Sequence, residues 1–277
     1  IQLDRDEIQS EITNQSVVVT GASGSIGSEL VRQILRFNPA NLIILDLSES
    51  GLHELSLELE EKWDFTAFSA VIADVRDYNR IQRIMEHYQP NMIFHAAAYK
   101  HVPVLETNPC EAVCTNIHGT KILADMAIRY NARKFILIST DKAVNPTNVM
   151  GASKRIAEMY TQSLNSFLDT MNNGTYTRFI TTRFGNVLGS NGSVIPRFRR
   201  QIQEGGPVTV THPDIYRYFM TIPEACQLVL EAGCIGKGAE IFLFDMGESV
   251  RIYDMARKMI KLSGFEPDEE IPIIFTG

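Results

Sequence analysis

Short apolar runs alternate with longer segments of helical period from residue 16 to residue 183. The runs are rich in β-branched and aliphatic residues and predict buried strands at Val17–Val19, Leu42–Leu45, Ala67–Ala73, Met92–His95, Phe135–Ser139 and within Thr177–Arg183. The longest amphipathic segments predict helices at Pro109–Tyr130 and Gly151–Met171. Strands that alternate with helices pair in parallel and bind ligands at their carboxyl ends. The pattern therefore predicts an α/β fold built on a doubly wound parallel sheet.

Three glycines follow the first predicted strand, at Gly21, Gly24 and Gly27, and an amphipathic helix begins among them. Gly21 allows a tight turn, Gly24 lets a phosphate approach the backbone, and Gly27 lets the helix lie against the strand. This order places backbone N–H groups and a helix N-terminus against an anion. The alternative is a purely structural turn, since any tight strand-to-helix connection can contain glycine. The context favours a Rossmann-type dinucleotide site, and the Gly-x-x-Gly-x-x-Gly spacing resembles the short-chain dehydrogenase/reductase superfamily.

Asp46 ends the second predicted strand, where a carboxylate accepts the ribose hydroxyls of adenosine and repels a 2′-phosphate, so NAD is favoured over NADP. Asp74 ends the third, where a carboxylate can meet the adenine amino group; the alternative is a helix cap at Asp77. The small residues Ala96–Ala98 would let a cofactor lie flat over the strand ends, or they pack in the core. The residues expected to line the NAD site are Gly21, Ser23, Gly24, Ser25, Ile26, Gly27, Asp46, Asp74, Val75, Ala96, Ala97 and Ala98.

The pattern loosens after Phe184, where glycine, asparagine and proline become frequent. Shorter elements are predicted at Ile195–Glu204, Val208–Thr211, Pro223–Ala232, Ile241–Asp245 and Tyr253–Leu262. We therefore predict a polar lead-in segment at residues 1–15, an NAD-binding domain at 16–185, and a mainly substrate-binding α/β lobe at 186–277. We also expect the chain to be a piece of a longer protein, truncated at both ends.

The 277 residues carry a formal net charge of −7, which excludes a general nucleic-acid-binding protein because such a protein needs a basic face. No apolar run reaches the ~18 residues that span a bilayer. The four cysteines require no disulfide, which fits a reducing compartment. Cys110, Cys114 and His118 have the spacing of metal ligands on a helix, but we interpret them as a packed helix face and expect no metal.

Thr140, Asp141 and Lys142 directly follow the fifth predicted strand, and Met150 and Lys154 lie four residues apart on the next helix. Most short-chain dehydrogenases have tyrosine and lysine at these two helix positions. The tyrosine removes a substrate proton, while the lysine lowers its pKa and holds the nicotinamide ribose. A methionine thioether cannot transfer a proton. Either the domain only binds NAD, or Thr140, Asp141 and Lys142 perform the acid–base chemistry; we favour the second, against a solvated loop pair at Asp141 and Lys142.

The stretch Thr140–Lys154 resembles the bacterial UDP-N-acetylglucosamine 4,6-dehydratases, and its Met150 is typical of their membrane-anchored branch in capsule, O-antigen and protein-glycan pathways. The resemblance extends to His95–Pro103, Phe184–Pro196 and Tyr216–Thr221 and so covers nearly the whole chain. It implies a lyase that dehydrates UDP-N-acetylglucosamine to a UDP-4-keto-6-deoxy sugar. NAD would oxidise C4, water would leave across C5 and C6, and the hydride would return to C6.

The resemblance also assigns roles to residues. The catalytic set is Thr140, Asp141, Lys142, Met150 and Lys154. In it, Lys142 would be the base at C5, Asp141 the acid at O6, and Thr140 the candidate group for the C4 hydroxyl. Further cofactor contacts would come from Lys154 at the nicotinamide ribose and from Lys100 and Asn116 at the nicotinamide end. The contacts to the UDP-sugar would come from Asn186, Val194 and Arg217.

Members of this family carry N-terminal transmembrane helices and a further C-terminal Arg-Pro-Gly segment. We therefore expect a cytoplasmic domain of a protein anchored in the bacterial inner membrane. The superfamily pairs its two long helices across a two-fold axis, so a homodimer through residues 109–130 and 151–171 is expected. Two alternatives stay open: a nucleotide-sugar epimerase, which needs only the oxidation at C4, and a catalytically silent NAD-binding module.

Overall fold

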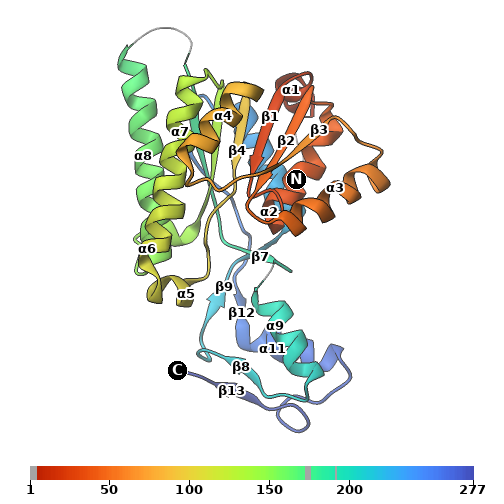
Figure 1. Cartoon of the computed structure of the whole chain (residues 1–277). Helices are drawn as coiled ribbons and strands as arrows, with labels where there is room; N and C mark the ends of the chain where they lie inside the picture. Colours follow the sequence, from red (N-terminus) through yellow and green to blue (C-terminus); the bar gives the residue numbers. More distant parts are fainter. Residues whose placement is uncertain (1–4, 172–175, 191) are drawn as a thin grey trace. The chain divides into compact units, whose positions relative to one another are not determined.

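The computed structural model describes residues 5–171, 176–190 and 192–277, and the chain forms two compact units (Figure 1). The first unit runs to Phe184 and takes in Cys226–Phe244, and the second consists of Gly185–Ala225 and Asp245–Gly277. The boundary between the units at Phe184 and Gly185 lies beside the predicted domain boundary at residue 185. The sequence pattern assigns residues 226–244 to the smaller lobe, whereas in the structure the chain returns there to the first unit.

The first unit is built on a seven-stranded sheet in the order β11-β6-β5-β4-β1-β2-β3, and every pairing in it is parallel. The strands are β1 (Ser16–Thr20), β2 (Asn41–Asp46), β3 (Phe68–Ile72), β4 (Met92–His95), β5 (Lys134–Thr140), β6 (Arg178–Phe184) and β11 (Ile241–Leu243). The winding reverses between β1 and β4, and such a switch point is where doubly wound sheets bind ligands at the strands' carboxyl ends. The predicted fold class is confirmed.

Helices cover the two faces of this sheet. On one face lie α4 (Tyr78–Tyr88), α7 (Thr120–Arg129) and α8 (Val149–Met171), whose apolar sides share one buried core with the strands. Elsewhere in the unit lie α1 (Arg5–Ile12), α2 (Ser25–Ile34), the 3₁₀ turn Leu35–Phe37 and α3 (Glu49–Trp63), together with α10 (Ile222–Ile235), most of which belongs to this unit. Residues 1–4 of the predicted lead-in segment lie outside the described residues.

Two details of this unit differ from the sequence prediction. β11 pairs with β6, Ile241 opposite Thr181, so it is an edge strand of the main sheet; three residues are too few to carry a periodic signal. The predicted helix Pro109–Tyr130 is divided into α6 (Pro109–Ala112), a π-helical segment at Val113–Gly119, and α7. Apolar spacing does not distinguish i→i+4 from i→i+5 hydrogen bonding over a single turn, and such π segments are frequent at functional sites.

The second unit has its own small core. In it α9 (Val194–Gln203) and α11 (Ile252–Leu262) pack with β8 (Val208–Val210), which pairs in parallel with β13 (Ile273–Phe275). The remaining strands form two pairs, β7 (Asn186–Leu188) with β10 (Phe219–Thr221), and β9 (Tyr216–Arg217) with β12 (Val250–Arg251). Across residues 5–171, 176–190 and 192–277, no helix combines the length and the apolar character needed to cross a membrane.

Candidate active site

Two glycines of the turn after β1, Gly21 and Gly27, leave no room for a side chain. Gly21 has φ +65°, and a Cβ added to it would lie 2.7 Å from the backbone nitrogen of Ala97, in the loop after β4. A Cβ on Gly27 would lie 2.0 Å from the carbonyl oxygen of Gly21. Glycine is therefore required for the conformation at Gly21 and for the close approach at Gly27. The turn and the loop after β4 meet at the sheet's switch point, as a dinucleotide site needs.

The start of α2 suits an anion. Gly24 is the N-cap residue and makes no side-chain cap, and the first turn carries no acidic residue. No carboxylate within the first turn of α2 therefore competes with an anion for the positive end of the helix dipole. Ser25, Ile26 and Gly27 form this first turn, and their contact with a cofactor stays a prediction.

Asp46 is held in place at the end of β2. Its Oδ2 accepts a hydrogen bond from the backbone N–H of Ser23 at 2.9 Å, and its Oδ1 accepts one from the N–H of Ser48 at 2.9 Å. Each carboxylate oxygen has a second lone pair, so Asp46 retains acceptors for a ribose diol. The contact to Ser23 also ties the carboxylate to the glycine turn.

The Asp74 carboxylate, expected near adenine, is bound to Arg76. Arg76 donates to it from Nε at 2.8 Å and from Nη2 at 2.7 Å, and these hydrogen bonds lower the pKa of Asp74. The helix cap is made by Asp77, which accepts the N–H of Arg80 at 3.0 Å. Val75 is buried and faces Gly119 of the π segment, where an added Cβ would lie 2.7 Å from its Cγ2.

A buried chain of hydrogen bonds runs from β1 to the π segment through His95. Thr20 Oγ1 lies 2.7 Å from His95 Nδ1, and His95 Nε2 lies 2.9 Å from Thr120 Oγ1, which in turn donates to the carbonyl oxygen of Asn116 at 2.7 Å. Because Thr120 gives its proton to Asn116, it must accept from Nε2, which makes His95 the Nε2–H tautomer. Burial, together with the nearby Lys154, lowers the pKa of His95 to about 3. His95 is therefore a neutral structural link.

Asn116 joins three parts of the expected nicotinamide end. Its Oδ1 accepts from the N–H of Tyr99 at 2.8 Å, and its Nδ2 donates to the Tyr99 carbonyl and to Ser153 Oγ, both at 3.0 Å. The loop after β4, which carries Ala96–Ala98 and the exposed Lys100, is thereby attached to the π segment and to α8. The spacing of residues in the sequence gave no signal for Tyr99 or Ser153.

Thr140, Asp141 and Lys142 form one hydrogen-bonded group at the carboxyl end of β5. Lys142 Nζ donates to Asp141 Oδ1 at 3.0 Å, and Thr140 Oγ1 donates to the same oxygen at 2.8 Å. Residues Asp141–Ala143 form a 3₁₀ turn, and a Cβ added to Gly151 of α8 would lie 2.2 Å from the Lys142 carbonyl oxygen. The structure thus brings an acid, an amine and a hydroxyl together at the ligand-binding edge of the sheet, against the start of α8.

Met150 and Lys154 have different surroundings. Met150 is buried in a small apolar cluster with Leu105 of α5 (Val102–Thr107) and Ala112 of α6. Lys154 is also buried; burial lowers the pKa of its ammonium group to about 8, and the charge of Glu158 opposes this shift. A buried lysine that titrates near neutrality suits a site with a bound ligand.

The expected substrate contacts lie in the second unit. Asn186 begins β7, Val194 begins α9, and Arg217 lies on β9, where its Nη1 donates to the carbonyl of Tyr216 at 3.0 Å. Arg217 is exposed. Their role toward a UDP-sugar stays a prediction.

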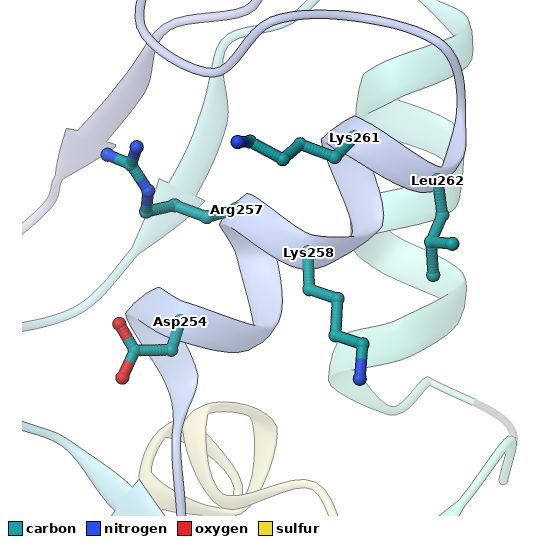
Figure 2. A pocket seen from close by; sticks show the side chains of 5 residues that line it. All are labelled: Asp254, Arg257, Lys258, Lys261 and Leu262. Carbon is teal, nitrogen blue, oxygen red and sulfur yellow. The ribbon is translucent and has the colours of Figure 1, made fainter.

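Cys110, Cys114 and His118 are exposed, so the interpretation as a packed helix face is wrong within this chain. In the described part of the chain no group of three or more His, Cys, Asp or Glu side chains could hold a metal ion. A hollow of about 430 Å³ lies along α11 (Figure 2). It is lined by Asp254, Arg257, Lys258, Lys261 and Leu262 and contains none of the predicted site residues.

Comparisons with known proteins identify the family of this chain. A sequence model of the family described as "Polysaccharide biosynthesis protein" matches residues 17–277. The chain is 51% identical over 278 residues to the capsular polysaccharide biosynthesis protein CapD of Staphylococcus aureus, covering 100% of this chain but 45% of CapD, so it spans less than half of that relative. It is 32% identical over 247 residues to a UDP-N-acetylglucosamine 4,6-dehydratase (inverting) of Campylobacter jejuni, covering 88% of this chain and 71% of that enzyme. It is 35% identical over 234 residues to a UDP-glucose 4-epimerase of Rickettsia rickettsii, covering 83% and 66%.

Solved structures share the fold. The X-ray structure of Pen from Bacillus thuringiensis superposes with a TM-score of 0.87 at 34% identity, covering 96% of this chain and 81% of that one. A double mutant of DesIV, a dTDP-glucose 4,6-dehydratase from Streptomyces venezuelae solved with NAD bound, superposes with a TM-score of 0.82 at 20% identity, covering 94% of this chain and 84% of that one.

Proposed function

Because the chain belongs to the polysaccharide biosynthesis protein family, we propose that it is an NAD-dependent lyase that removes water from UDP-N-acetylglucosamine to give the UDP-4-keto-6-deoxy sugar. The observation that carries this proposal is the hydrogen-bonded group of Thr140, Asp141 and Lys142 at the carboxyl end of β5. A nucleotide-sugar dehydratase needs both an acid and a base beside the sugar, and this group supplies both.

The first unit fits the proposed cofactor. The turn at Gly21 and Gly24 with the start of α2 would hold the pyrophosphate, Asp46 the adenosine ribose, and Lys154 the nicotinamide ribose. When bound, NAD supplies the oxidation at C4 that makes the C5 proton acidic, and the reduction at C6 that completes the reaction. Lys100, Asn116 and the alanines after β4 would lie at its nicotinamide end.

The Asp141–Lys142 contact supports the elimination step. The elimination needs a neutral Lys142 amine and a protonated Asp141. Lys142 would release its ammonium proton to solvent, and Asp141 would receive the C4 hydroxyl proton through Thr140 when C4 is oxidised. The amine of Lys142 would then take the C5 proton while Asp141 gives its proton to the C6 oxygen, which leaves as water. After this step Lys142 is an ammonium and Asp141 a carboxylate. Lys142 would return its proton to C5 when the hydride enters C6, which leaves the neutral amine for the next turnover.

Thr140 is the proposed contact for the C4 hydroxyl. Its Oγ1 already donates a hydrogen bond to the Asp141 carboxylate. A sugar hydroxyl that donates to Thr140 Oγ1 would therefore be connected to that carboxylate by two consecutive hydrogen bonds. Met150 stands where related enzymes have tyrosine, and its thioether has no proton to exchange. Thr140 would pass the proton of the C4 hydroxyl to Asp141 in place of that tyrosine.

In the second unit, Asn186, Val194 and Arg217 are proposed to contact the UDP-sugar, with Arg217 pairing with the diphosphate. A homodimer through residues 109–130 and 151–171 is also proposed. Along α8 the apolar side chains of Ile156, Met159 and Phe167 are exposed, and a second copy would cover them. Anchoring of a longer chain in the inner membrane stays a prediction.

The second candidate is a nucleotide-sugar epimerase, which the similarity to the Rickettsia enzyme supports. An epimerase needs the oxidation at C4 but no acid–base pair for elimination, so the Asp141–Lys142 pair favours the dehydratase. A silent NAD-binding module would leave that pair without a use.

Mass spectrometry of the sugar product in deuterated water tests the proposal. We expect the loss of one water from UDP-N-acetylglucosamine and the incorporation of solvent deuterium at C5. Lys142→Ala should lower turnover by ~10²–10⁴-fold, the usual contribution of a general base, while NAD stays bound. Lys258→Ala, which removes an exposed lysine on α11, is the matched control and should leave turnover unchanged. An unchanged mass with inverted C4 would instead identify an epimerase.

A further inference from the structure

Glu158 is the most completely enclosed charge in the described part of the first unit that the proposed reaction does not use. Its side chain has no exposed surface, and both carboxylate oxygens accept hydrogen bonds. Ser139 Oγ donates to Oε1 at 2.6 Å, Arg183 donates to Oε1 from Nε at 2.8 Å and to Oε2 from Nη2 at 2.5 Å, and Arg155 donates to Oε2 at 3.2 Å.

These partners come from the elements that carry the candidate active site. Ser139 immediately precedes Thr140, and on β6 Arg183 lies opposite Ser139 in the parallel pairing of β5 with β6. Glu158 lies on α8, one helical turn after Lys154, so the two side chains share a face of the helix. A single carboxylate therefore connects the end of β5, the end of β6 and the lysine-bearing turn of α8.

We propose that Glu158 and Arg183 form a positioning pair that fixes the carboxyl end of β5 against α8, and thereby sets the place of Asp141 and Lys142 relative to Lys154. This inference rests on the proposed function of those three residues. A bidentate guanidinium–carboxylate pair fixes both distance and angle, which an apolar contact does not. Removing a buried charge from water is costly, and here the cost is offset because both oxygens are fully hydrogen-bonded.

The pair also has an electrostatic consequence for Lys154. The titratable groups that act on Lys154 are Glu158 on its own helix and His95 of β4, and His95 is neutral. Glu158 is ionised: burial acts to raise its pKa, but the hydrogen bonds from Arg183 and Ser139 lower it below its ordinary value. The negative charge of Glu158 thus helps to keep Lys154 protonated near neutral pH.

Three variants test the pair. Glu158→Gln removes the charge and the bidentate contact, Ser139→Ala removes only the link to β5, and the control Arg155→Gln removes only the partly exposed partner of the same carboxylate. Two quantities are measured for each: kcat and KM per NAD-loaded site with UDP-N-acetylglucosamine, and NAD affinity as a function of pH by intrinsic fluorescence. Thermal unfolding of each variant reports stability separately.

We expect Ser139→Ala to lower kcat by about 10-fold with an unchanged KM, because the acid–base group is displaced while the binding residues are kept. Glu158→Gln should lower kcat at least as much, and should also move the midpoint at which NAD affinity falls with rising pH to a lower value. Arg155→Gln should match the wild type in both quantities. If Glu158 and Ser139 served stability alone, Glu158→Gln and Ser139→Ala would unfold at a lower temperature. Their kcat and their pH midpoint for NAD would then equal the values of Arg155→Gln, and this result would overturn the proposal.

The two measurements separate this inference from the proposed function. If the wild type removes no water from the sugar, the proposed function fails. The positioning pair is then tested only by the pH midpoint at which NAD affinity falls. An unchanged midpoint in Glu158→Gln would then reject the pair. If Glu158→Gln does not fold, Ser139→Ala decides through kcat, since it deletes one hydroxyl and leaves the ion pair intact.

Discussion

The backbone of Gly151 lies so close to Lys142 that a Cβ at residue 151 would be 2.2 Å from the Lys142 carbonyl oxygen. Gly151→Ala must therefore displace either the start of α8 or the turn that carries Asp141 and Lys142. We expect turnover of UDP-N-acetylglucosamine to fall by at least about 10-fold, since small misplacements of reacting groups have large effects on rate. Overpacking should also lower the free energy of unfolding by ~1–3 kcal/mol. Steady-state kinetics and urea unfolding measure the two effects.

The control for this substitution is Ser166→Ala, which changes a small exposed residue farther along α8. It should alter neither quantity. Wild-type turnover in Gly151→Ala would show that the turn tolerates displacement, and would contradict the link between α8 and the acid–base group.

Met150 offers a test of whether its thioether takes part in the reaction. It is buried with Leu105 and Ala112, so its role in the structure is packing. Met150→Leu conserves volume and should cost less than ~1.5 kcal/mol, with turnover kept within a fewfold of the wild type. Met150→Ala opens a cavity and should cost ~2–5 kcal/mol. A stable Met150→Leu protein with turnover lost would instead place the sulfur among the reacting groups.

The fold could be predicted from the sequence because its signals are local. The apolar strands, the glycine turn and Asp46 each lie within a few residues, and the alternation of strands and helices fixes a parallel sheet. β11 could not be predicted in this sheet, because a three-residue strand has no measurable period and its place is decided by tertiary pairing with β6. The π segment at Val113–Gly119 was missed for a similar reason: its hydrogen-bond register leaves the apolar spacing nearly unchanged.

The candidate site was predicted in part. The three consecutive residues Thr140, Asp141 and Lys142 were visible as a cluster of reactive groups, and the structure shows their mutual hydrogen bonds. The contact of Glu158 with Ser139 and Arg183 joins residues 19 and 25 positions away, and such contacts depend on the register of α8 against the sheet. A single sequence does not contain that register.

His95 makes stability depend on pH in a defined direction. In the folded protein, burial lowers the pKa of His95 from 6.5 to about 3, whereas in the unfolded chain it titrates near 6.5. Below pH 6.5 the unfolded state therefore binds a proton that the folded state does not, and the free energy of unfolding falls by ~1.4 kcal/mol per pH unit. Between pH 6.5 and pH 5 the loss from this group should be about 2 kcal/mol.

Urea unfolding at several pH values measures this slope, and two variants isolate its origin. His95→Gln should weaken the protein at pH 7 because the chain from Thr20 to Thr120 is cut, and should flatten the slope between pH 6.5 and 5. The control His118→Gln removes an exposed histidine and should leave the slope as it is. A slope that survives in His95→Gln would mean that groups other than His95 cause it.

Asp46 should determine the choice between NAD and NADP through its charge and its two backbone contacts. The carboxylate accepts the N–H groups of Ser23 and Ser48, and an asparagine amide can accept only one of them while its NH₂ group faces the other. Asp46→Asn should therefore weaken NAD binding by about 10-fold, the equivalent of one hydrogen bond to a charged group. It should also lower the ratio of NAD affinity to NADP affinity, because the repulsion of a 2′-phosphate is lost. Titrations of both dinucleotides measure the ratio, with Glu49→Gln at the exposed start of α3 as the control. An unchanged ratio of NAD affinity to NADP affinity in Asp46→Asn would show that another group distinguishes the two riboses.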